Sequence, residues 1–154
     1  MNFMTSTGDP LNYFAIYEFD GTAHGGLVPQ LNVSAVGKNR EQVLERLRQG
    51  IALALHDLGE VPPNQHDRLP DDLQEFAAAE TLFLEPAEMN PVSVEVERAV
   101  QASGLTDSEL ARRMGTSPAA VGRMQDYFYW GHSLATLRKL ADALGIKLEI
   151  SLAA

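Results

Sequence analysis

Residues 106–123 read TDSELARRMGTSPAAVGR, and this run decides how the rest of the chain is interpreted. The side chain of Thr106 can accept from an amide of the following turn, and Glu109 can reach back to the amide of Thr106. Gly115 can adopt the left-handed conformation that ends a helix. Ser117 can then cap a second helix, with a proline at its first position. The run predicts two short helices joined by a tight turn, the layout that places one helix in the major groove of DNA.

Spacing separates the inward and outward residues of these two helices. The apolar residues at helical spacing predict the inward faces, which are Leu110, Ala111 and Met114 in the first helix and Ala120, Val121 and Met124 in the second. The candidate DNA-binding residues are Ser108, Ser117, Ala119, Ala120, Arg123 and Gln125. Among them, Arg123 could form two hydrogen bonds with a guanine or contact only a phosphate, and both interpretations stay open. Ala119 could contact the methyl group of a thymine.

The charge of the chain is unevenly distributed. The 154 residues carry a formal net charge of −9. Residues 92–154 contain seven Lys or Arg and seven Asp or Glu, whereas residues 1–91 contain five and fourteen. The neutral part can approach DNA, and the acidic part suits a basic protein partner. The alternative, that the excess acid only confers solubility, is equally compatible with the charge alone.

The composition excludes several classes of protein. The chain contains no cysteine, which excludes disulfides and thiolate metal sites and fits a reducing compartment. Its apolar runs all fall short of the roughly 20 residues that span a bilayer. Residues 1–7 lack the basic region and apolar core of a signal peptide. We therefore expect a cytoplasmic protein without membrane contact.

The first part of the chain predicts a small sheet with one long helix. Three strands are predicted close together in sequence, at 12–19, 24–31 and 33–37, which favours an antiparallel meander. An apolar stripe between an Asn cap and a glycine predicts a helix over 40–58. A polar, Pro-rich stretch follows, and then a short helix within 71–80 and a fourth strand at 81–85 that returns to the sheet.

The second part predicts helices and one final strand. Residues 86–91 form the predicted linker between domains at 1–85 and 92–154. Helices predicted at 92–103 and 134–144 flank the pair described above.

Residues 146–152, IKLEISL, alternate strictly and predict a strand. That strand needs a partner, either in the first sheet or in another subunit, and we favour the second. The predicted class is therefore α+β. A small antiparallel or mixed sheet with one long helix precedes an all-α domain that ends in a short strand.

Several segments resemble a known combination of domains. Residues 33–58, with an Asn cap and a Glu-rich amphipathic helix, resemble the N-terminal domain of HicB antitoxins, and residues 29–32 (PQLN) match in part that family's Pro-Asp-Leu-Pro turn. Residues 108–115 (SELARRMG) and 137–146 (LRKLADALGI) are similar to the Cro/repressor-type helix-turn-helix domain that many HicB proteins carry. The resemblance implies a partial ribonuclease H-like N-terminal domain followed by a helix-turn-helix domain.

The resemblance also implies a function. HicB antitoxins bind and silence HicA, a small ribonuclease toxin, and they repress their own operon. The chain would then be an antitoxin of a type II toxin–antitoxin system, with a HicA-like toxin and operator double-stranded DNA as partners. A single reading helix gives little affinity, so we expect a homodimer or higher oligomer through the C-terminal domain. The final strand and the aromatic residues 127–130 are the candidate dimer contacts.

Two other functions stay open at this point. One is a stand-alone helix-turn-helix transcriptional regulator whose N-terminal domain senses a small molecule. The other is an orphan nuclease with a DNA-targeting tail. The neighbouring gene discriminates between the antitoxin and the stand-alone regulator, because a small basic open reading frame beside this one would favour the antitoxin.

Several residues depart from the helix-turn-helix pattern or carry two interpretations. Asp107 and Pro118 stand where the family often has Gln, and Gly122 replaces a common Ser. Arg112 and Arg113 could neutralise phosphates, or one could lie on a solvated face. The aromatic run Tyr127-Phe128-Tyr129-Trp130 could stack on nucleic acid, but packing is favoured because it lacks basic neighbours. His132 is expected to cap or pack.

The titratable residues predict no catalytic, metal or cofactor site. A metal-dependent nuclease needs several carboxylates around two magnesium ions. The candidates are Glu18 and Asp20 at the first strand and Glu41, Glu45 and Asp57 in the long helix, and no spacing rule places the two groups together. The histidines at 24, 56 and 66 lack ligand spacing. We therefore expect a binding protein and not an enzyme, without a metal or cofactor.

Overall fold

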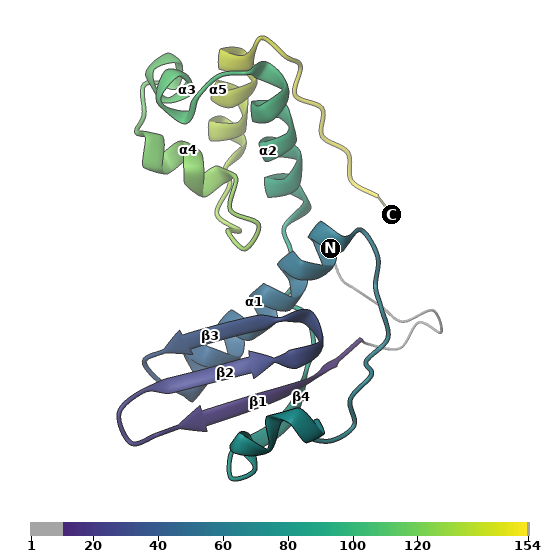
Figure 1. The fold of residues 1–154 in the computed structure, drawn as a ribbon. Helices are drawn as coiled ribbons and strands as arrows, with labels where there is room; N and C mark the ends of the chain where they lie inside the picture. The colour runs from purple at the N-terminus through teal and green to yellow at the C-terminus, as the bar shows by residue number, and fades with distance from the viewer. Residues whose placement is uncertain (1–10, 154) are drawn as a thin grey trace. The chain divides into compact units, whose positions relative to one another are not determined.

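The computed structural model describes residues 11–153 and divides the chain into two compact units, with the boundary after Glu88. The first unit combines a four-stranded sheet with helices, and the second contains helices (Figure 1). The predicted α+β class is therefore confirmed. The assignment of separate functions to 1–85 and 92–154, joined by a linker at 86–91, stays a prediction.

The sheet of the first unit consists of β1 (Tyr13–Phe19), β2 (His24–Val28), β3 (Val33–Gly37) and β4 (Glu80–Leu84). Their order is β3-β2-β1-β4, and every neighbouring pair is antiparallel. β2 ends three residues earlier than predicted. The reason is that Pro29, which has no N–H to donate to a ladder, begins the short 3-10 helix η1 (Pro29–Leu31).

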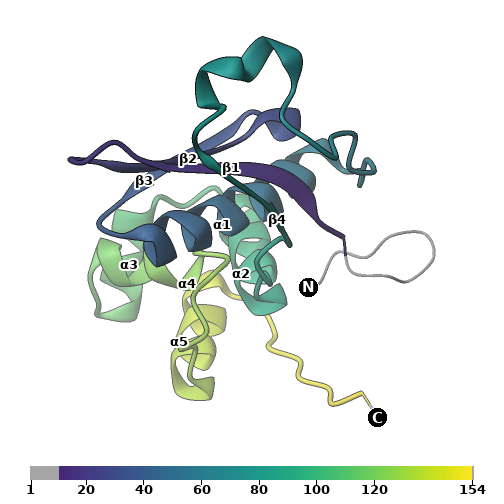
Figure 2. The same cartoon turned by 90° about the horizontal axis from the view of Figure 1, so that it is seen from below.

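Helix α1 (Arg40–Leu58) covers one face of the sheet, as Figure 2 shows. Asn39 accepts from the N–H of Gln42 at the start of the helix, and Gly59, at φ 69°, follows its end. Alternate strand residues point at α1 and form the apolar core with it; the buried members are Leu11, Tyr13, Ala15, Tyr17, Val28, Leu84, Val43, Leu47, Ile51 and Leu55.

The helix approaches the sheet closely at Gly26. A Cβ atom on Gly26 would lie 2.6 Å from Cδ1 of Leu47 and 2.9 Å from Cγ1 of Val43. The missing side chain therefore lets α1 pack against the middle of β2. Because side chains alternate along a strand, Gly25 and Leu27 point to the opposite face of the sheet, which we call the outer face.

The outer face is only partly covered. Helix η2 (Asp71–Phe76) lies on the side of the sheet away from α1 (Figure 2). The N–H of Phe14 donates to Oδ1 of Asn64 at 3.1 Å, and the ring of Phe14 packs edge-on against Phe83. Phe14 is therefore buried, whereas Val36 on the outer face of β3 is 69% exposed.

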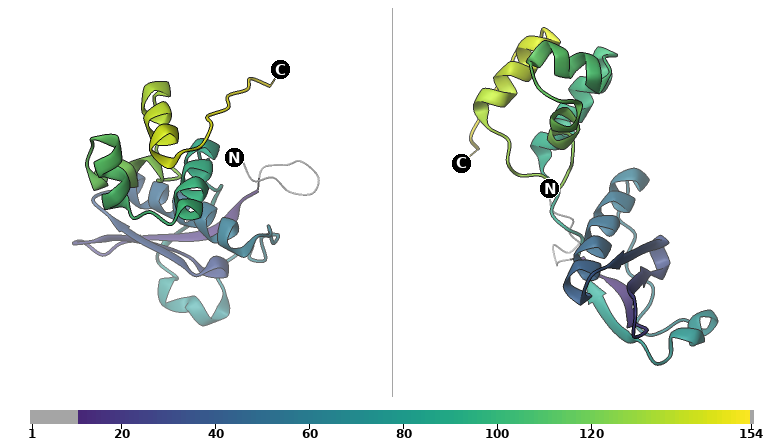
Figure 3. Two further views of the ribbon diagram at one scale, coloured as in Figure 1. Left: turned by 90° about the horizontal axis from the view of Figure 1, so that it is seen from above. Right: turned by 90° about the vertical axis from the view of Figure 1, so that its left-hand side faces the viewer.

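The described part of the second unit contains α2 (Pro91–Ser103), α3 (Asp107–Met114), α4 (Pro118–Met124) and α5 (Leu134–Leu144), seen from two sides in Figure 3. These helices share one core, whose buried members are Val96, Val100, Leu110, Ala111, Val121, Met124 and Leu140. Four of the six predicted inward residues of the two helices belong to this core. The other two, Met114 and Ala120, are half-buried.

The predicted strand at 146–152 is wrong for the single chain. Residues 146–153 have no regular secondary structure and leave α5 as an extended trace (Figure 3). A strand requires a neighbouring strand that shares its backbone hydrogen bonds, and the described part of this unit supplies none. Ile150 and Leu152 remain 61% and 96% exposed. Pairing of this segment with another subunit stays a prediction.

Candidate functional site

The α3–α4 pair is built by the caps that its sequence predicts. Oγ1 of Thr106 accepts from the N–H of Glu109 at 3.1 Å, and Oε2 of Glu109 accepts from the N–H of Thr106 at 2.9 Å. The second bond holds the pKa of the Glu109 carboxyl below its usual value. Gly115, at φ 69°, follows α3, and Oγ of Ser117 accepts from the N–H of Ala120 at the start of α4. The predicted capping box, turn and second cap are all confirmed.

The six candidate DNA-binding residues fall into two groups. Those exposed are Ser108, Ser117, Ala119 and Arg123, whereas Ala120 and Gln125 are half-buried. Ala119 and Arg123 are four residues apart and therefore lie on the same face of α4. The exposed surface of α4 thus combines small side chains with one guanidinium.

Gln125 is bonded to the start of α3. Its Nε2 donates to Oδ1 of Asp107 at 3.0 Å and to the carbonyl of Val121 at 3.2 Å. A DNA contact by Gln125 would therefore use its Oε1 as an acceptor. The bond also gives Asp107 a structural role, because it joins the first residue of α3 to the residue that follows α4. Sequence reasoning missed this bond, since no local pattern links residues 18 positions apart.

The three arginines of α3 and α4 differ in their surroundings. Nη1 of Arg113 donates to the carbonyl of Ala143, near the end of α5, at 3.3 Å. All three arginines are exposed. Arg112 is the better candidate for a phosphate contact, because the guanidinium of Arg113 already donates to the end of α5.

Two tyrosines of the aromatic run pack within the second unit. The hydroxyl of Tyr127 donates to Oε1 of Glu97 at 2.9 Å. The ring of Tyr129 lies edge-on to that of His132, with the centroids 5.0 Å apart. Trp130 is 55% exposed. The packing interpretation therefore describes the tyrosines, and Trp130 is the residue of this run that can meet a partner.

Asn90 connects this loop to the start of α2, a role that sequence reasoning missed. The side chain is buried, its Oδ1 accepts from the N–H of Val92 at 3.0 Å, and its Nδ2 donates to the carbonyl of Tyr129 at 2.9 Å. Beside it, Nε2 of His132 lies 2.8 Å from the carbonyl of Met124. These bonds fix the loop that follows α4, and His132 packs as expected.

The candidate carboxylates of the first unit do not converge. Glu18 points to the outer face, because Tyr17 before it packs towards α1. Glu41, Glu45 and Asp57 lie on α1, which covers the other face. Among residues 11–153, no group of three or more His, Cys, Asp or Glu could hold a metal ion.

Asp20 has a structural role at the β1–β2 turn. Its Oδ1 accepts from the N–H groups of Thr22 and Ala23, both at 2.8 Å. Those bonds, led by that from Ala23, hold the pKa of the Asp20 carboxyl below its usual value. The carboxylate therefore stays ionised at neutral pH.

No protein-family model matches this chain, and no curated protein sequence matches it. The family resemblance accordingly rests on the motifs quoted above and on the order of the elements. Within residues 11–153, no helix combines the length and the apolar character needed to cross a bilayer.

Proposed function

We propose that the chain is a HicB-like antitoxin that binds and neutralises a HicA-like ribonuclease toxin and represses its own operon. One observation carries the proposal: a neutral unit with a fully capped α3–α4 pair is joined to a unit that holds all the excess acid. Residues 1–88 contain fourteen Asp or Glu and five Lys or Arg, and the remaining residues balance. DNA repels an acidic surface, whereas a basic protein is attracted to one, so the neutral unit suits DNA and the acidic unit suits a basic protein.

The DNA-binding half of the proposal assigns α3 and α4 to a helix-turn-helix, with α4 as the reading helix. Its support is the pair of caps, the left-handed Gly115 between the helices and the exposed face of Ala119 and Arg123. Small side chains allow the helix backbone to approach the groove closely, and Arg123 supplies the strong donor. Arg112 adds a phosphate contact.

The toxin-binding half assigns the first unit to the partial ribonuclease H-like domain of the HicB family. Its support is the order of elements, in which three strands, one long helix and a returning strand follow one another. A toxin that cuts RNA is expected to be basic, which complements the acidic unit.

The active repressor is a dimer in this proposal, because two half-sites one helical turn apart provide the affinity that one helix lacks. The extended residues 146–152 and the exposed Trp130 supply the contact. Residues 146–152 keep alternate apolar side chains at the surface, and in a second copy each such segment finds the strand partner that the described part of its own unit does not offer.

Co-expression with the small basic protein encoded by the adjacent gene tests the proposal. Growth arrest caused by that protein should be relieved by the full-length chain, and the two should co-purify. Persistent arrest would overturn the antitoxin function. If operator binding survives in that case, the ligand-sensing regulator becomes the better explanation.

A further inference from the structure

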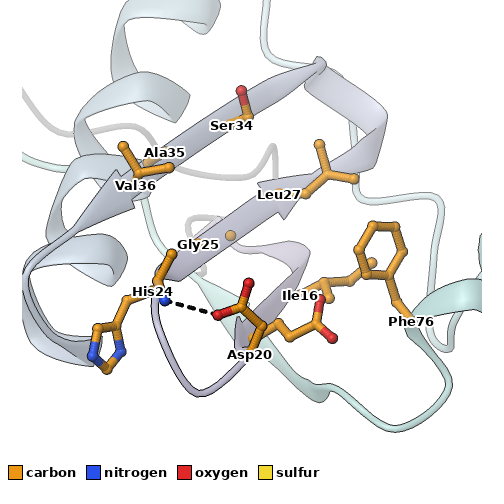
Figure 4. Close-up of a pocket in the computed structure, with 12 residues that line it drawn as sticks. Ile16, Asp20, His24, Gly25, Leu27, Ser34, Ala35, Val36 and Phe76 are labelled. Atoms are coloured by element: carbon orange, nitrogen blue, oxygen red, sulfur yellow. Dashed lines mark hydrogen bonds between the residues drawn. The ribbon is translucent and has the colours of Figure 1, made fainter.

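The uncovered part of the outer face contains a depression of about 550 Å³ (Figure 4). Its floor is Gly25 on β2, where a Cβ atom would have as its nearest neighbour the carbonyl oxygen of Ala35, at an ordinary distance of 3.7 Å. Its walls are Leu27 from the same strand, Val36 from the neighbouring β3 and Phe76 from η2. The missing side chain at Gly25 therefore leaves room for an apolar group from outside.

Carboxylates border this apolar depression. Glu18 and Asp20, at the end of β1, lie at its edge, and Asp20 is held ionised in the β1–β2 turn. Helix η2, which supplies Phe76, also carries the exposed residues Asp71, Asp72 and Glu75. No Lys or Arg lines the depression.

The basic residues of this unit are concentrated elsewhere. Four of its five Lys and Arg lie within residues 38–48, at the start of α1 and just before it. Arg40 donates to both carboxylate oxygens of Glu80, and Arg48 pairs with Glu45 at 3.1 Å. Arg46 donates to the carbonyl of Val36. The outer face is therefore the part of this unit where apolar surface and uncompensated negative charge meet.

We infer that this depression is the docking site for a basic protein, which inserts one apolar side chain over Gly25 and places Lys or Arg against Glu18 and Asp20. The inference rests on the proposed function, which makes the toxin the occupant. Charge complementarity selects this occupant, because a neutral or acidic protein would leave the two carboxylates desolvated without a partner. An apolar anchor surrounded by contacts that exclude water is a common arrangement for the residues that contribute most to an interface.

Two substitutions test the site in the full-length chain. Gly25→Val fills the floor, because the Cβ atom meets only an ordinary contact there and valine is a residue typical of strands. Val36→Lys places a positive charge at the wall. Leu58→Lys is the matched control, because it adds the same charge at an apolar residue of similar exposure on α1. Operator binding and thermal unfolding confirm that each variant is folded.

The probe is the toxin purified from its complex, with affinity measured by calorimetry. We expect Gly25→Val and Val36→Lys each to weaken binding at least about tenfold and Leu58→Lys to leave it within about twofold. The pair Glu18→Gln and Asp20→Asn should slow association and reduce its salt dependence.

Three results overturn the inference in distinguishable ways. Wild-type affinity in both Gly25→Val and Val36→Lys would show that the toxin docks elsewhere, while the antitoxin function stands. Equal weakening by Leu58→Lys would show a general charge effect rather than a site. A wild-type chain that does not bind the toxin would remove the proposed function and this site with it.

Discussion

The adjacent glycines of β2 lie in different environments, since Gly26 packs against α1 and Gly25 faces the depression on the outer face. Substitution of each by alanine tests this difference. Gly26→Ala is expected to lower the free energy of unfolding by about 1–3 kcal/mol, because its Cβ would lie 2.6 Å from Leu47. Gly25→Ala should leave that free energy unchanged or raise it by up to about 1 kcal/mol, because the new methyl group meets only an ordinary contact, 3.7 Å from the carbonyl oxygen of Ala35, and restricts the unfolded chain. Urea unfolding measures both. Equal stability of the two variants would contradict the packing described for α1.

Tyr13 makes the first unit sensitive to alkaline pH. Burial raises the pKa of Tyr13 to about 12, and its hydroxyl donates to the carbonyl of Pro62. The pKa in the folded state lies above the ordinary value of about 10. The contribution of the protonated Tyr13 hydroxyl to the stability of the fold is therefore complete below pH 10 and is lost as the pH rises towards 12. We expect the free energy of unfolding to fall over that window. In Tyr13→Phe this contribution to the pH dependence should disappear, and a variant with an unchanged alkaline profile would show that another group is responsible.

On the scale of elements, α4 should carry the base-reading surface. Arg123→Ala is expected to weaken operator binding by about 1–3 kcal/mol while toxin neutralisation is unchanged. Arg138→Ala, which removes an exposed arginine from α5, is the control. If Arg123 binds guanine, the loss concentrates at one base pair; if it binds a phosphate, the loss is uniform and the salt slope falls by about 1. An unaffected Arg123→Ala would show that another element enters the groove.

The C-terminal segment can be tested through its charge pattern. Within one chain, Nζ of Lys147 lies 3.1 Å from Oε1 of Glu149. If two copies pair antiparallel about Leu148, Lys147 of each copy lies opposite Glu149 of the other. Lys147→Glu alone should therefore weaken the dimer, and adding Glu149→Lys to it should restore the dimer. Light scattering across a concentration series measures this. A restored dimer would support the register, and a single variant that dimerises like the wild type would exclude it.

For the whole molecule, features decided by neighbours in sequence were predictable, and those decided by distant partners were not. The cap at Thr106, the turn at Gly115 and the cap at Ser117 depend on contacts within a few residues, and all three form. The prediction of the final strand was wrong for the single chain, because alternation shows only that a segment can be a strand and not which strand it pairs with.

The candidate site follows the same division. Exposure of Ala119 and Arg123 follows from helical spacing and was foreseen. The bond of Arg113 to Ala143 joins positions 30 residues apart, and that of Gln125 to Asp107 joins positions 18 residues apart. Periodicity in the sequence does not predict contacts of this kind. The same applies to Asn90, whose partner Tyr129 lies 39 residues away.

The bond between Asp107 and Gln125 sets a boundary for anyone who wishes to transplant the DNA-reading part of this chain. A graft of α4 alone would deliver Gln125 into a host without its acceptor, or would leave Asp107 behind without its donor. The smallest portable cassette is therefore residues 107–125, extended to Thr106 so that the first cap travels with it. Chimeras cut inside this cassette should lose their operator even when every base-contacting side chain is retained.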